Sequence, residues 1–226
     1  MVVLRLLSFC LILTAVWACS SQPSGVSSSA SVKQDVSPVD QPQASEADAL
    51  KKAFTPFIVY QDKSSRNRFT PSGYMPTGEC IALDDGWQYD PGEGKTSIRV
   101  IYDTACSKEG RKWAGVYWQN PPDNWGDRKG GYNLTGAVQL VFWAKGELGG
   151  ERIEEFRVGG IGANNMYPDS DSAFIGPVIL ANEWKKYVID LRGKDLSYIS
   201  GGFAWVANVE GNPHHCTFYI DDIHFE

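Results

Sequence analysis

The sequence has few of the residues and motifs on which enzymes commonly rely. Only three of its 226 residues are histidine, and His214-His215-Cys216 has no second ligand cluster at metal spacing, so a zinc site is not indicated. A G-x-S-x-G nucleophile motif, a phosphate-binding loop and a nucleotide-binding fingerprint are all missing. These absences disfavour catalysis and favour a binding role.

Carboxylates in a catalytic arrangement are missing as well. A glycoside hydrolase built on a β-sandwich would set acidic residues at i, i+2 and i+4 on one strand face. Residues 151–155 place Ile153 in the middle position, and residues 222–226 place His224 there. We therefore expect no enzymatic activity, and a glycoside hydrolase or lyase is the most distant of the alternatives.

The chain also lacks an excess of positive charge. It has 21 Lys and Arg against 27 Asp and Glu, which gives a formal net charge of −6 at pH 7. An acidic surface repels polyanions, so we do not expect nucleic acid or anionic lipid as the main partner.

The amino-terminal residues match a secretory signal peptide. Arg5 is the only charge ahead of an apolar run that is too short to span a bilayer as a stable helix. The residues Val16–Cys19 resemble a bacterial lipobox, which implies lipidation of Cys19 and contact with a membrane through the lipid anchor only. Trp17 departs from the small residue usual at its position, and an ordinary signal-peptidase cut after Ala18 also fits.

A polar segment follows the cysteine. It is rich in Ser, Pro, Gln and Ala, with no aromatic residue between Trp17 and Phe54, so it predicts a disordered tether. Ser20 resembles the outer-membrane sorting signal of a Gram-negative lipoprotein, which places the protein in the cell envelope. The expected organisation is a signal peptide over residues 1–18, a lipid-anchored linker over residues 19–52 and one folded domain over residues 53–226.

The folded part predicts many short antiparallel strands. Apolar and polar residues alternate, and turn signals such as DPGEG, NPPDN and GELGG separate the runs. The candidate strands are residues 57–61, 80–85, 96–103, 114–120, 137–146, 152–160, 177–181, 185–191, 201–209 and 216–225. Helical periodicity is almost absent and no internal repeat is visible, so the expected fold is all-β, a two-sheet antiparallel β-sandwich or jelly roll.

Several stretches carry a family resemblance. "AGVYWQNPPDNWG", "LVFWAKGELGGE", "WKKYVIDLRGKDLSYISGGFAWVAN" and "TFYIDDIHFE" are similar to segments of bacterial carbohydrate-binding-module jelly rolls, the galactose-binding-like fold of families such as 4, 11, 22 and 30. The resemblance extends over residues 57–226 and implies non-catalytic binding of a polysaccharide or oligosaccharide. The same fold carries assembly modules, so the alternative is a protein-interaction module of an envelope complex that uses the same aromatic face.

Aromatic and polar residues on outward strand positions are the candidate sugar ligands. A sugar offers C–H bonds on one face and hydroxyls at its rim, which suits an exposed ring with amides, carboxylates or guanidinium groups at its edge. Strand alternation turns these residues away from the core, and a Pro-rich loop adds one more ring. If their strands share one sheet, the expected carbohydrate site comprises Tyr117, Gln119, Trp125, Trp143, Glu155 and Arg157.

A structural reading of the same rings stays open. Tryptophan more often packs in a core than binds a ligand, and we expect this role for Trp118, Trp184 and Trp205. Tyr117 and Trp125 fit packing and binding equally well.

The resemblance further implies a structural calcium ion between the first strand, a glycine-containing turn and the last strand. Asp62 and Asp222 are the expected side-chain ligands, Asp90 opens the turn, and residues 92–95 would supply backbone carbonyls. The alternative is that these carboxylates cap turns or lie in water.

Cysteine usage predicts one disulfide. Cys10 leaves with the signal peptide and Cys19 is assigned to lipid, so three cysteines remain in an oxidising compartment. If the strands on either side of the DPGEG turn form a hairpin centred near residue 93, Cys80 and Cys106 face each other across it. Cys216 is then unpaired and buried.

Overall fold

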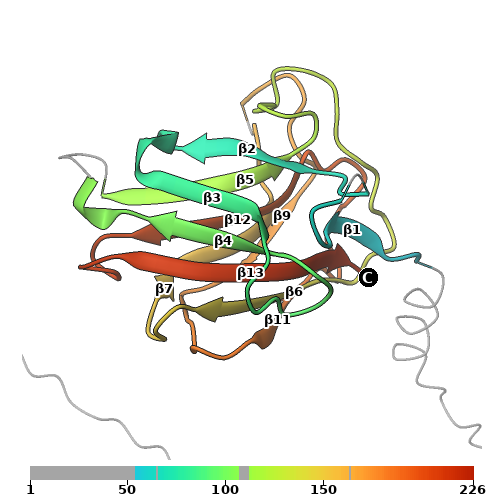
Figure 1. Ribbon diagram of the computed structural model, residues 1–226. Helices are drawn as coiled ribbons and strands as arrows, with labels where there is room; N and C mark the ends of the chain where they lie inside the picture. Colours follow the sequence, from blue (N-terminus) through green and yellow to red (C-terminus); the bar gives the residue numbers. More distant parts are fainter. Residues whose placement is uncertain (1–53, 65, 107–111, 163) are drawn as a thin grey trace, which may run out of the picture. The chain divides into compact units, whose positions relative to one another are not determined.

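Two antiparallel β-sheets packed face to face form the fold (Figure 1). The computed structural model describes residues 54–64, 66–106, 112–162 and 164–226, all of which belong to one compact unit. The described residues begin at residue 54. The predicted signal peptide, the predicted linker and the predicted lipidation at Cys19 therefore lie outside them. Within the described ranges, no helix has the length and apolar character that crossing a bilayer requires.

Sheet A has six strands, and its centre is the last strand of the chain. Strand order across the sheet is β11-β6-β13-β4-β3, and β1 pairs with the end of β13. The strands are β1 (Phe57–Tyr60), β3 (Ile81–Trp87), β4 (Ser97–Tyr102), β6 (Gln139–Gly146), β11 (Lys185–Asp190) and β13 (Cys216–Phe225).

Sheet B has five strands in the order β2-β5-β12-β8-β9. These are β2 (Thr70–Met75), β5 (Trp113–Gln119), β8 (Glu155–Gly159), β9 (Ser172–Ile175) and β12 (Gly201–Asn208). A separate pair joins β7 (Arg152–Ile153) to β10 (Val178–Ile179), and two 3₁₀ turns are η1 (Gly78–Cys80) and η2 (Thr104–Cys106).

Inward-facing rings from both sheets build the core. Trp118 and Trp205 are buried, as predicted, and the Trp118 ring lies 5.4 Å from that of Phe203 in an edge-to-face contact. Phe142 of sheet A reaches across to Phe203 of sheet B at 5.1 Å. Because burying each large ring contributes about 2 kcal/mol, this aromatic layer is a main source of stability.

The all-β sandwich predicted from the sequence is confirmed, and each predicted strand is present. Residues 152–160 divide into β7 and β8, and two further strands, β2 and β9, were not predicted. β2 contains Pro71 and Gly73, which read as turn residues, but an edge strand tolerates proline because one side of its backbone has no partner strand.

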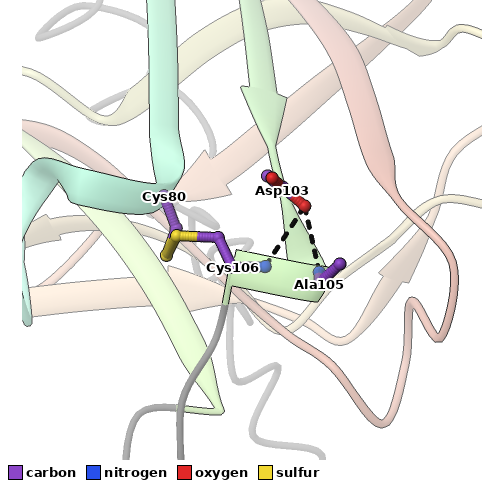
Figure 2. Close-up of a disulfide and its surroundings, with 4 residues drawn as sticks. All are labelled: Cys80, Asp103, Ala105 and Cys106. Atoms are coloured by element: carbon purple, nitrogen blue, oxygen red, sulfur yellow. Dashed lines mark hydrogen bonds between the residues drawn. A yellow bond between two sulfur atoms is a disulfide. The ribbon is translucent and has the colours of Figure 1, made fainter.

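A disulfide joins Cys80 and Cys106, with 5.5 Å between their Cα atoms. The predicted pair is present, but the predicted cross-strand position is wrong. The register of β3 with β4 pairs Ile81 with Tyr102, which aligns Cys80 with Asp103. Figure 2 shows how η2 turns Cys106 back toward Cys80, with Asp103 accepting the backbone N–H groups of Ala105 and Cys106.

Candidate functional site

The outer face of sheet B carries most of the predicted sugar ligands. Strand register places Gly73, Tyr117, Ala204, Arg157 and Phe174 in one row across all five strands. The next row contains Met75, Gly115, Val206 and Glu155. The expectation that β5 and β8 contribute to one face is therefore correct.

Tyr117 and Gln119 lie on this face but are buried beneath other groups. Tyr117 is 7% exposed, its hydroxyl donates to the Gly159 carbonyl at 3.0 Å, and burial raises its pKa to about 12. Gln119 has no exposed surface, and its amide donates to the Asn124 carbonyl at 3.0 Å. Neighbouring groups already occupy polar atoms of both side chains, which contradicts the expectation that Tyr117 and Gln119 lie exposed for a sugar.

Asp169 ties Ile161, which follows β8, to the start of β12. Its carboxylate accepts the hydroxyl of Ser200 at 2.6 Å and the backbone N–H groups of Ile161 at 3.0 Å and Gly201 at 3.2 Å. Burial raises the pKa of this carboxyl above its ordinary value. The clamp holds Ile161 on the sheet, where it packs against Tyr117.

Trp125 is also held in place, with its ring accessible. Asn165 donates its side-chain amide to the Trp125 carbonyl at 2.6 Å, and the backbone N–H of Tyr167 donates to the Gly126 carbonyl at 2.9 Å. The Trp125 ring stands edge-on to that of Tyr117, 5.9 Å between centroids, and the residue is 37% exposed. Tyr117 thus supports Trp125 from below.

Phe174 is an exposed ring that sequence reasoning missed. It is 55% exposed and lies beneath the Arg157 guanidinium, 5.2 Å from its ring centroid. Arg157 is held in turn by Glu155 at 2.6 Å. The signal was available in the alternation of SAFI, but β9 was not predicted as a strand and Phe174 was therefore not placed.

The comparisons with known proteins concern the fold. No protein-family model matches the chain, and no curated protein matches its sequence. A family 30 carbohydrate-binding module is similar at a TM-score of 0.50 and 15% identity, over 76% of this chain and 99% of that one. A family 11 carbohydrate-binding module of a cellulosomal cellulase of Clostridium thermocellum is similar at a TM-score of 0.50 and 13% identity, over 76% and 94%.

The fold is the jelly roll of carbohydrate-binding modules. At 13–15% identity the likeness concerns the backbone arrangement alone.

Trp143 does not belong to the same site. In this jelly roll, β6 lies in sheet A, where Trp143 pairs with Lys186 on one side and Asp221 on the other. Its side chain therefore points outward from the opposite sheet. The prediction that it joins Trp125 in one site is wrong because strand order, which alternation along the chain does not reveal, assigns β5 and β6 to different sheets.

The carboxylates predicted to bind calcium do not come together in the jelly roll. Among the described residues, no group of three or more His, Cys, Asp or Glu is placed to hold a metal ion. The Asp62 carboxylate accepts the backbone N–H groups of Lys95 at 2.6 Å and Thr96 at 2.8 Å, and these bonds lower its pKa. Asp90 pairs with Lys145.

The turn over residues 92–95 directs backbone N–H groups at the neighbouring carboxylates. Gly92 and Glu93 donate to the Asp221 carboxylate at 2.9 and 3.0 Å, and Asp222 has its carboxylate 3.5 Å from the His224 ring nitrogen. Asp62 thus caps the turn, as the alternative reading has it. Among the described residues, these side chains do not fit a calcium site.

Proposed function

We propose that this chain binds carbohydrate without cleaving it, on the outer face of sheet B. The observation that carries the proposal is that two exposed rings, Trp125 and Phe174, and the Arg157–Glu155 pair occur together on one face of a carbohydrate-binding-module fold. Aromatic rings stack against the C–H face of a sugar, and the charged pair offers a donor and an acceptor to its hydroxyls.

Rigidity of the face supports the same proposal. Asp169 and Asn165 fix the loops that carry Trp125, and Glu155 with Phe174 fixes Arg157. Binding therefore orders few protein side chains, which leaves more of the stacking energy for affinity.

The test is affinity electrophoresis of the protein through gels that contain single soluble polysaccharides. Trp125→Ala and Phe174→Ala should each weaken retardation by about tenfold or more, because truncation of a central ring typically costs 1–2 kcal/mol or more. Leu148→Ala is the matched control, since Leu148 is 69% exposed in the turn after β6 and away from this face. If no polysaccharide retards the wild-type protein and an envelope protein binds it through Trp125, the result would favour the protein-interaction alternative.

We also propose that the chain is a lipoprotein of the cell envelope, acylated at Cys19 and held off the membrane by residues 20–52. Support for this comes from the lipobox-like Val16–Cys19 and the polar composition that follows it. A tether suits a glycan-binding domain because it lets the domain search a volume around its anchor.

A further inference from the structure

A second aromatic surface lies on the outer face of sheet A, away from the site described above. Strand register places Lys145, Tyr219, Arg99 and Asp84 in one row across four strands. The Lys145 ammonium lies 5.1 Å from the Tyr219 ring centroid, and the Arg99 guanidinium lies 4.5 Å from that of Trp87. Rings and cations thus alternate over this sheet.

The connection between β3 and β4 crosses the same face and is firmly anchored there. In Figure 1 it is the green loop that passes in front of β13 toward β6 and β11. Gly92 and Glu93 donate to the Asp221 carboxylate, and the Trp184 indole donates to the Asp90 carbonyl at 3.1 Å. The loop therefore has a fixed position on the sheet.

This anchored loop presents Tyr89, which is 74% exposed. No other aromatic residue among those described is more exposed. Its ring lies 5.1 Å from that of Trp87 and is inclined to it by 53°. An exposed ring backed by a second ring on an anchored loop is available to stack against the C–H face of a sugar.

Charges on this face are already paired within the protein. Arg99 lies 3.6 Å from Glu147, and Lys145 is bonded to Asp90. The Tyr219 hydroxyl also bonds to Glu147 at 3.2 Å. Because Arg99 and Lys145 each have a carboxylate beside them and Asp84 adds a negative charge to the row, this row has no excess positive charge to attract an acidic glycan. Its stacking rings and hydrogen-bonding edges therefore fit a neutral hydroxyl-rich ligand.

We propose that Tyr89 and Trp87 form a second carbohydrate-binding surface, which takes a neutral polysaccharide chain. The inference rests on the proposed function, since it uses the same stacking chemistry. The outer faces of two packed sheets point in opposite directions, so one domain holds two glycan segments at once and can bridge neighbouring chains.

Trp143 belongs to this second surface. It lies in the row next to Lys145, between Lys186 and Asp221, and is half-buried. The ring that the sequence assigned to a sugar site therefore does lie on a candidate sugar face, although on the other sheet from Trp125.

The experiment counts binding sites per chain by calorimetric titration of the full-length protein with cellohexaose, xylohexaose and mannohexaose, each used separately. The wild-type chain should take up two oligosaccharides. Tyr89→Ala should retain one site and weaken the other by about tenfold or more, whereas Tyr89→Phe, which keeps the ring, should retain both. Trp125→Ala should show the complementary loss.

The outcomes separate the two proposals. One site that Trp125→Ala removes and Tyr89→Ala leaves intact overturns the second surface and keeps the proposed function. No uptake of any of the three probes by the wild-type chain removes the support for both. Because Tyr89 is largely exposed, its substitution should leave the melting temperature unchanged, and that measurement excludes unfolding as the cause of a lost site.

Discussion

At the scale of single residues, Tyr117 allows a structural role to be distinguished from direct contact with a sugar. Its hydroxyl bonds to the Gly159 carbonyl and its ring supports Trp125, while little of it reaches solvent. Tyr117→Phe removes that hydrogen bond, so the free energy of unfolding should fall by about 1 kcal/mol while glycan affinity changes less than about twofold. Urea denaturation and gel retardation measure the two effects. An unchanged stability with lost binding would show instead that the hydroxyl contacts sugar.

Asp62 makes a pH-dependent contribution to the free energy of unfolding, and the direction of its pKa shift fixes the sign. Bonds from Lys95 and Thr96 lower its pKa below the unfolded value, so its stabilisation is complete above that value, about 4, and is lost as pH falls through the folded pKa. Asp62→Asn should therefore lower the free energy of unfolding by about 1 kcal/mol at pH 7, a modest figure because the group is near solvent. The difference from wild type should shrink below pH ~4. Urea denaturation at several pH values checks this, and a gap that stays constant down to pH ~3 contradicts it.

At the scale of elements, alternation along the chain was enough to predict most strands and the burial of Trp118 and Trp205. It was not enough to predict which strands become neighbours, because pairing is non-sequential and β5 and β6 diverge into different sheets. For the same reason Tyr117 could be placed on an outward position, but the packing of Ile161 against it could not be foreseen from spacing.

The disulfide links the turns that flank the β3–β4 pair. It closes a loop with a sequence separation of 26, for which chain entropy predicts a stabilisation of about 3 kcal/mol. The double variant Cys80→Ser, Cys106→Ser should lose about that free energy of unfolding in urea, and dithiothreitol should destabilise the wild type but not the variant. Glycan retardation should persist, because both turns lie outside the two aromatic faces. A variant as stable as wild type would show that the link constrains little of the unfolded chain.

At the scale of the whole molecule, the proposals fit together through geometry. Back-to-back sheets turn Trp125 and Tyr89 away from each other, so a domain with both surfaces bridges glycan strands that a single-faced domain can only coat. The net charge of −6 repels polyanions but does not act on uncharged chains. The charge therefore favours bridging of neutral glycans over acidic ones. Anchoring would convert a bridging domain into a link between a membrane and a polysaccharide layer.

Anchoring to the membrane depends on Cys19, so substitution of Cys19 is the decisive test of the anchored arrangement. Two or more acyl chains hold a protein on a membrane firmly where one does not. In cells fed an alkyne-labelled fatty acid, wild-type protein should carry the label and sediment with membranes, whereas Cys19→Ser should lose both. Cys10→Ser is the matched control, because it changes a cysteine of the same apolar run ahead of the lipobox. Label retained by Cys19→Ser, or wild-type protein that is unlabelled and soluble after cleavage, would contradict acylation and favour the ordinary signal-peptidase cut after Ala18.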